Sequence, residues 1–166
     1  MWQHLMKEEI TFSRSKTCEA GHNVLQKVKR ISVDEDIIRT KGIEALSESL
    51  ILHSSYKCSI SNCSRQIKDV KIDFNVQIYI ELEIMISSQT LMTCSPKDFP
   101  IYLNFDNNTF RLAGIIAFVP GHFTALCRRI NGNWEEHNDL CQGKKNFNSN
   151  MKITPIAAIY ITSKKN

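Results

Sequence analysis

The sequence predicts an α+β protein built mainly on one antiparallel β-sheet, with a single helix toward its N-terminus. Residues 76–86 alternate apolar and polar side chains, which is typical of a strand with one buried face. Residues 110–119 are almost continuously apolar, as expected of a central strand that is covered on both faces. Only residues 34–52 carry apolar side chains at the spacing of a long helix.

The predicted helix has a start signal and an internal weakness. Asp34 or Asp36 can cap its N-terminus. Gly42 lies inside it and costs about 1 kcal/mol relative to alanine. The residues before the helix, 1–33, are expected to be irregular except for one extended stretch around residues 9–12. The apolar stripe of the helix consists of Ile37, Ile38, Ile43, Leu46 and Leu50.

The C-terminal half is expected to be a succession of antiparallel strands. Pro120-Gly121 ends the apolar run, and Asn131-Gly132 is a strong hairpin signal between the two strands that follow. Besides 76–86 and 110–119, the sequence predicts strands over residues 101–105, 122–130, 133–137 and 154–162.

Length and composition indicate one ordinary globular domain. The 166 residues are 42% hydrophobic and 23% charged. No apolar run approaches the roughly 20 residues that cross a bilayer, and Lys7, Glu8 and Glu9 interrupt any secretory signal. We therefore expect an intracellular protein, cytoplasmic or nuclear, away from membranes. The net charge of +4 is scattered along the chain, so no nucleic-acid partner is expected.

Two pairs of metal-ligating residues stand in the N-terminal part. Cys18 and His22 are separated by three residues, and Cys58 and Cys63 by four. Because a short loop can bring both members of a pair to one ion, the four residues predict a structural zinc site. His53 is a competing ligand, and the alternative is that Cys58 and Cys63 are buried thiols flanking a turn.

His122 is the first residue after the Pro120-Gly121 break. A hairpin then returns a neighbouring strand that ends at Asn138 and Asp139, which places these side chains close to His122. A general base for a thiol needs this arrangement. One imidazole nitrogen takes the thiol proton, and a side-chain oxygen holds the other imidazole nitrogen in position. Taken alone, the pattern also fits a structural histidine at a strand end.

The segment around His122 resembles the histidine box of ubiquitin-specific proteases. The order and spacing match over about fifty-five residues, and the strand Ala157-Ala158-Ile159-Tyr160-Ile161 is similar to the family's closing strand. The matching positions are Phe110, Leu112, Gly114-Ile115, Gly121-His122-Phe123, Ala125, Arg128, Asn131-Gly132, Trp134 and Asn138-Asp139.

The resemblance implies that residues 1–166 form a single partial domain, the palm- and fingers-like half of a papain-like cysteine peptidase fold. Residues 1–65 would be an irregular and helical, zinc-binding fingers region, and residues 72–166 the sheet. His122 would be the general base, Asn138 its orienting partner and Asp139 a neighbouring acid that organises the site. The implied partner is ubiquitin or a ubiquitin-like modifier such as SUMO, with its conjugates, and the chemistry requires no cofactor.

The sequence offers no nucleophile for this base. Cys18 only faintly echoes the family's cysteine box, because the preceding glycine is absent and about a hundred residues separate it from His122. Cys94, Cys127 and Cys141 are not expected at a helix N-terminus, where a thiolate would be stabilised.

Three classes of function therefore stay open. The first is a fragment of a cysteine-type deubiquitinase or deSUMOylase. The second is a non-catalytic pseudoprotease module that binds ubiquitin, SUMO or another protein. The third, a zinc-stapled nucleic-acid binder, is disfavoured because no aromatic residues interleave with a basic stripe.

Overall fold

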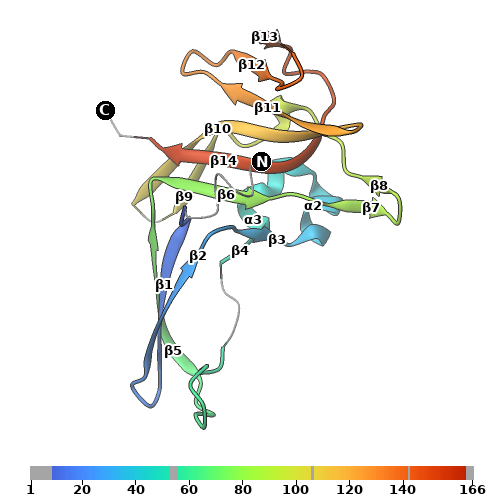
Figure 1. Cartoon of the computed structure of the whole chain (residues 1–166). Coiled ribbons are helices and arrows are strands. Elements are labelled where there is room, and N and C mark those ends of the chain that lie inside the picture. Colours follow the sequence, from blue (N-terminus) through green and yellow to red (C-terminus); the bar gives the residue numbers. More distant parts are fainter. Residues whose placement is uncertain (1–8, 53–55, 106, 142, 164–166) are drawn as a thin grey trace.

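The computed structural model describes residues 9–52, 56–105, 107–141 and 143–163. The fold is α+β and mostly antiparallel, as the sequence predicts. Figure 1 shows a broad sheet, an arm of three strands that projects from it, and short helices packed beside it. In chain order the elements are β1 (Phe12–Cys18), β2 (Asn23–Val28), β3 (Ser32–Val33), α2 (Glu35–Lys41), η1 (Ile43–Ala45), α3 (Leu46–Ser49), β4 (Leu50–Ile51), β5 (Ile67–Phe74), β6 (Gln77–Glu81), β7 (Met85–Ser87), β8 (Thr90–Leu91), η2 (Pro96–Asp98), β9 (Tyr102–Phe105), β10 (Asn108–Val119), β11 (His122–Arg128), β12 (Trp134–His137), β13 (Lys144–Phe147) and β14 (Thr154–Thr162).

The main sheet is organised around β10. Its strands follow the order β13-β12-β11-β10-β14-β6, and β9 also pairs with β10. The strands predicted over 101–105, 110–119, 122–130, 133–137 and 154–162 are confirmed as β9, β10, β11, β12 and β14. Strand β13 was not predicted, since its residues Lys144–Phe147 lack an apolar alternation and lie at the edge of the sheet.

Within the described residues 9–33, the expectation of an irregular segment is wrong. Strands β1 and β2 form a hairpin, and β5 pairs with the other side of β1, so that the order in the arm is β2-β1-β5. Residues along β1 alternate between buried and partly exposed, but two of the buried positions are Arg14 and Lys16. Charged residues at inward positions conceal the period-2 signal, because long basic side chains bury their apolar stems.

The long helix predicted over 34–52 is also wrong in its extent. Asp34 caps α2 as expected, since its side chain accepts hydrogen bonds from the backbone of Asp36 and Ile37. Gly42 then ends α2 with a φ of 83°, a conformation that glycine adopts without strain. The chain continues as the short turns η1 and α3 before β4. The helices in the described ranges are all too short or too polar to span a bilayer.

Strand β6 ends at Glu81, whereas the sequence predicted a strand over residues 76–86. The prediction of which side chains face the core is nevertheless correct. Ile78, Ile80, Leu82 and Ile84 are all buried. They join side chains from α2, η1 and β10 in one core between the main sheet and the helices. Trp134 belongs to the same core.

Tyr160 is the largest fully buried side chain and carries a polar group into this core. Its hydroxyl donates a hydrogen bond of 2.7 Å to the carbonyl oxygen of Pro100. Burial raises the pKa of the Tyr160 phenol, so the group stays a neutral donor. The bond ties β14 to the segment that leads into β9.

Replacing Tyr160 by Phe should lower the free energy of unfolding by about 1–2 kcal/mol, because the Pro100 carbonyl would lose its donor inside the protein. Urea denaturation monitored by circular dichroism measures the change. Tyr102→Phe is the matched control, since Tyr102 is exposed and its loss should be nearly neutral. Equal stability of the two variants would contradict a structural role for the Tyr160 hydroxyl.

Candidate functional site

His122 opens β11 directly after a two-residue turn. Val119 and His122 are paired across the β10–β11 hairpin, with Pro120 and Gly121 between them. Gly121 has a φ of 89°, and proline followed by a residue with positive φ is the pattern of a type II turn. The turn therefore fixes His122 at the tip of the hairpin, within the sheet.

The His122 imidazole has an unused hydrogen-bonding group. Its Nε2 is buried, and it has no hydrogen-bond partner among the described residues. A buried ring nitrogen without a partner is uncommon, since desolvation costs free energy that no bond returns. The Nε2 atom is therefore enclosed by the protein without the hydrogen bond that would offset its burial.

Asn138 and Asp139 follow β12 at the same end of the sheet. The β11–β12 ladder ends at the pair Ala125 and His137, so Asn138 comes one residue beyond the ladder. Asn138 therefore follows the strand that is paired with β11. However, the Asn138 Oδ1 accepts a hydrogen bond of 2.9 Å from the backbone N–H of Leu140, and Asp139 is exposed.

Thr124 links β11 to the C-terminal end of β12. Its hydroxyl lies 3.2 Å from the carbonyl oxygen of His137 and 3.2 Å from Oε1 of Glu136. Thr124 is buried and stands two residues from His122, on the same face of β11. This contact holds the backbone that leads into Asn138 against the histidine strand.

Glu135 joins three strands through a network of charges that sequence reasoning missed. Its carboxylate accepts a hydrogen bond of 2.6 Å from Nε of Arg129 and lies 2.9 Å from Nζ of Lys144. Nε2 of His137 is 3.7 Å away. The hydrogen bonds from Arg129 and Lys144 lower the pKa of Glu135 to about 2. Its partners lie just past β11 and in β13, which adjacent sequence positions do not reveal.

Glu135→Gln should destabilise the protein at pH 7 and lose this effect in acid. A carboxylate whose pKa is lowered to about 2 from 4.5 stabilises the fold above pH 4.5, and this contribution disappears as the pH falls toward 2. Thermal unfolding of both proteins from pH 7 to pH 2 measures the difference in stability between them. Glu83→Gln, at an exposed position, is the control. A difference that does not change with pH would argue against the network.

Cys94 and Cys127 are not placed as activated nucleophiles. Cys94 directly precedes the cap residue of η2, contrary to the prediction that it lies away from a helix start, but burial raises its pKa to about 12. Burial also raises the pKa of Cys127, which lies five residues along β11 from His122 and on the opposite face. A raised pKa disfavours the reactive thiolate.

The four predicted metal ligands come together at the far end of the arm. The ligand atoms of Cys18, His22, Cys58 and Cys63 all lie within 4.8 Å of one another. The Cys18 and Cys63 sulfurs are 4.0 Å apart, and the Cys58 sulfur is 3.8 Å from Nδ1 of His22. Ligands on a tetrahedral zinc ion, with Zn–S bonds near 2.3 Å, lie about 3.8 Å apart. The cluster can therefore hold a metal ion.

The arm positions this cluster from two sides. Cys18 ends β1, and His22 follows it in the turn to β2, while Cys58 and Cys63 belong to the loop before β5. Burial alone would raise the pKa of Cys18, but hydrogen bonds from the His22 and Ala20 backbone and from the neighbouring thiols lower it overall. His53, the competing ligand, lies outside the described residues.

Among solved structures, this fold is similar to chains of the SAGA DUB module. No protein-family model matches the sequence. A chain from the SAGA Ubp8/Sgf11/Sus1/Sgf73 DUB module has a TM-score of 0.56 at 17% identity, over 95% of this chain and 39% of that one. A chain from a SAGA DUB module bound to monoubiquitin has a TM-score of 0.53 at 14% identity, over 95% and 41%.

A sequence relative lies in a mobile genetic element. The "120.7 kDa protein in NOF-FB transposable element" of Drosophila melanogaster is 44% identical over 149 residues, which cover 86% of this chain. The match spans only 13% of that relative's length.

Proposed function

We propose that this chain is the sheet half of a ubiquitin-specific-protease-like thiol isopeptidase that acts on ubiquitin conjugates. The observation that carries the proposal is His122, held at a hairpin tip with a buried and unpartnered Nε2. The fold likeness to a chain of the SAGA DUB module, over 95% of this chain, supports it. Residues 1–166 would form one partial domain, with a fingers region up to about residue 65 and the palm sheet from 72 to 166.

In this proposal His122 removes the proton from a cysteine thiol, and the thiolate attacks the carbonyl carbon of the isopeptide bond. The C–N bond then breaks as protonated His122 returns the proton to the leaving lysine amine, and water hydrolyses the thioester that remains. Asn138 would hold the second imidazole nitrogen after its side chain turns away from Leu140, and Asp139 would help to organise the site. The chemistry requires no cofactor.

The nucleophile would come from a second half of the fold. The solved chain of the DUB module is more than twice as long as the part that this protein covers. A helical half with the cysteine fits in that additional length. An intracellular location, cytoplasmic or nuclear, goes with the proposal, because all six cysteines are free thiols.

A non-catalytic binding module is the second candidate. It is favoured by Cys94 and Cys127, since burial raises the pKa of both thiols and so disfavours the thiolate. Such a module would keep the surface that recognises the modifier and would bind ubiquitin or SUMO without cleaving it.

The isolated chain should bind ubiquitin and should not hydrolyse a fluorogenic substrate built on the ubiquitin C-terminus. Calorimetric titration with ubiquitin and with SUMO measures binding, and fluorescence release measures turnover. Absence of binding to either modifier would reject the binding module. Turnover that survives His122→Ala would reject the role of His122 as base.

We also propose that the cluster at the end of the arm holds a structural zinc ion. Three thiolates and one imidazole are a usual donor set for zinc, and a closed set of four protein ligands is typical of structural sites. Cys18 and His22 would bind from the β1–β2 turn, and Cys58 and Cys63 from the loop before β5. The ion would staple these two segments together.

The purified chain should contain one zinc ion per molecule, measured by atomic emission after dialysis without chelator. Cys18→Ser should remove the metal and lower the thermal stability of the arm. Cys141→Ser, at an exposed cysteine outside the cluster, should retain it. A metal-free wild-type chain, or equal zinc in the two variants, would end the proposal.

A further inference from the structure

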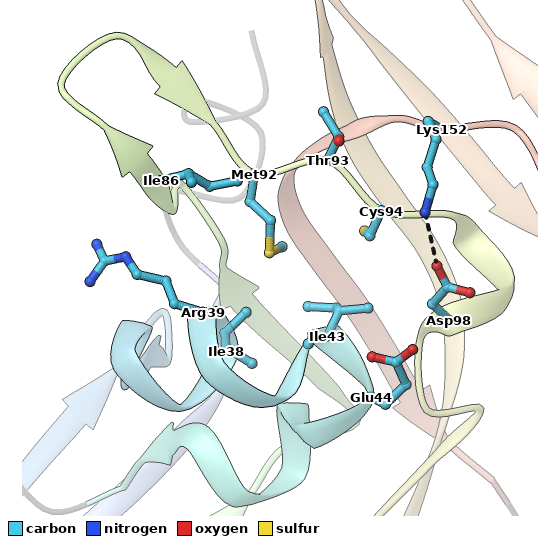
Figure 2. A pocket seen from close by; sticks show the side chains of 11 residues that line it. Ile38, Arg39, Ile43, Glu44, Ile86, Met92, Thr93, Cys94, Asp98 and Lys152 are labelled. Carbon is cyan, nitrogen blue, oxygen red and sulfur yellow. Dashed lines mark ion pairs between the residues drawn. The ribbon is translucent and has the colours of Figure 1, made fainter.

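A cavity of about 340 Å³ lies away from both His122 and the arm cluster, between α2, the β7–β8 hairpin and η2 (Figure 2). Its apolar lining includes Ile38, Ile43, Met92 and Cys94, all of them buried. The volume is at the lower end of the range of about 300–1,000 Å³ found for ligand pockets. It is large enough for one or two side chains of a partner.

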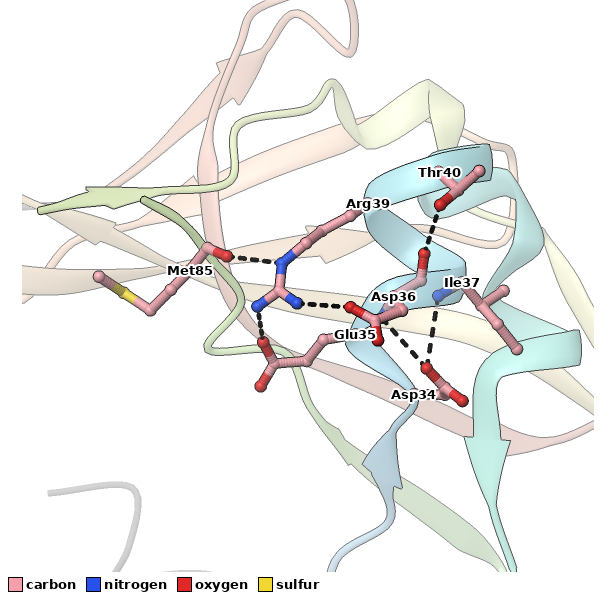
Figure 3. Close-up of polar contacts among 7 residues, drawn as sticks. All are labelled: Asp34, Glu35, Asp36, Ile37, Arg39, Thr40 and Met85. Carbon is pink, nitrogen blue, oxygen red and sulfur yellow. Dashed lines mark hydrogen bonds and ion pairs between the residues drawn. The ribbon is translucent and has the colours of Figure 1, made fainter. Parts of the chain in front are cut away.

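One wall of the cavity is held in place by Arg39 on α2. Its Nε donates a hydrogen bond of 2.8 Å to the carbonyl oxygen of Met85, where β7 begins (Figure 3). Its other guanidinium nitrogens pair with Glu35 and Asp36. The clamp fixes α2 against the hairpin, and it neutralises the positive charge of Arg39 within the protein.

The opposite wall is the η2 turn, which is likewise fixed. Asp98 Oδ2 accepts a hydrogen bond of 2.9 Å from the Ser95 backbone N–H and lies 3.7 Å from Nζ of Lys152. The Ser95 hydroxyl lies 3.1 Å from the carbonyl oxygen of Asn150. Both charges on this wall therefore have partners.

Glu44 differs from these groups because its carboxylate has no hydrogen-bond or ion-pair partner in the described part of the chain. Figure 2 shows the carboxylate at the edge of the cavity, facing Asp98 and the apolar lining. It lies against Gly42, where a Cβ atom would be 2.3 Å from Oε2 of Glu44. Glycine at 42 therefore makes room for the acid in this position.

The pKa of the Cys94 thiol reflects the charges around the cavity. Burial is the main reason that its pKa rises to about 12; the Asp98 and Glu44 carboxylates raise it further, and Lys152 opposes them. The electrostatic effect of the surrounding charges thus favours cations over anions at the cavity.

We propose that this cavity binds a lysine side chain of a partner protein, together with a neighbouring apolar residue. The ammonium group would pair with Glu44, and the apolar residue would fill the space lined by Ile43 and Met92. The proposal is independent of the isopeptidase function, because it involves neither His122 nor the metal cluster.

The test uses three capped tripeptides with the sequences Leu-Lys-Leu, Leu-norleucine-Leu and Leu-Glu-Leu. Nuclear magnetic resonance titration of the isotope-labelled chain follows the amide signals of Ile43, Met92 and Thr93. The lysine peptide should shift these signals and bind about three- to fivefold more tightly than the norleucine peptide, the range of a partly exposed ion pair. The glutamate peptide should bind most weakly.

Glu44→Gln should abolish the preference for lysine over norleucine while keeping the apolar contact. Glu48→Gln is the matched control, since Glu48 is a nearby exposed glutamate that already pairs with Lys41. Equal binding of the lysine and norleucine peptides, an undiminished preference in Glu44→Gln, or unchanged signals at Ile43 and Met92 would each overturn the proposal.

Discussion

The pairing of β10 with its neighbours is the constraint on which the rest of the structure depends. This strand contacts β9 and β14 along its first half and β11 and β14 along its second. Gly114 allows β11 to approach closely, because a Cβ there would lie 3.0 Å from the backbone oxygen of Leu126. The register set by this approach carries through the hairpin to Val119 and His122. The position of the histidine is thus a consequence of backbone pairing in the core.

The same pairing explains which features the sequence could predict. Apolar runs and alternation identify β10, β11 and β14, because these strands bury regular faces. The arm was missed because Arg14 and Lys16 occupy inward positions of β1, where charged residues conceal the alternation. The guanidinium of Arg14 donates to the backbone oxygen of Leu52 and to Gln26. Contacts of this kind join residues far apart in the chain and leave no local pattern.

Some features of the candidate site could likewise be predicted from the sequence, and others could not. The hairpin signals at 120–121 and 131–132 were sufficient to predict that His122 begins one strand and that Asn138 follows the strand paired with it. They could not predict the hydrogen bond between Asn138 and the Leu140 backbone, which depends on the conformation of the turn after β12. The metal cluster was predicted from ligand spacing, since short loops constrain each pair of ligands. The partners of Glu135 come from two directions in the sheet, so only the assembled strands reveal them.

The histidine site and the metal cluster lie in different parts of the fold. The main sheet presents an imidazole whose Nε2 has no partner, and the arm presents four ligand atoms in a single cluster. Under the proposal, the histidine would act either together with a nucleophile from another part of the fold or in a module that binds the modifier without cleavage.

The central claim is tested most directly with a fusion protein in which a helical half that carries the family's cysteine box is placed before this chain. The account predicts that the fusion protein releases the fluorophore from a ubiquitin C-terminal substrate. His122→Ala should abolish this activity, whereas His137→Ala, at an exposed ring on the neighbouring strand, should leave most of it intact. Full activity of the His122→Ala protein, or an inactive fusion protein that contains the cysteine box, would contradict the assignment of His122 as the general base.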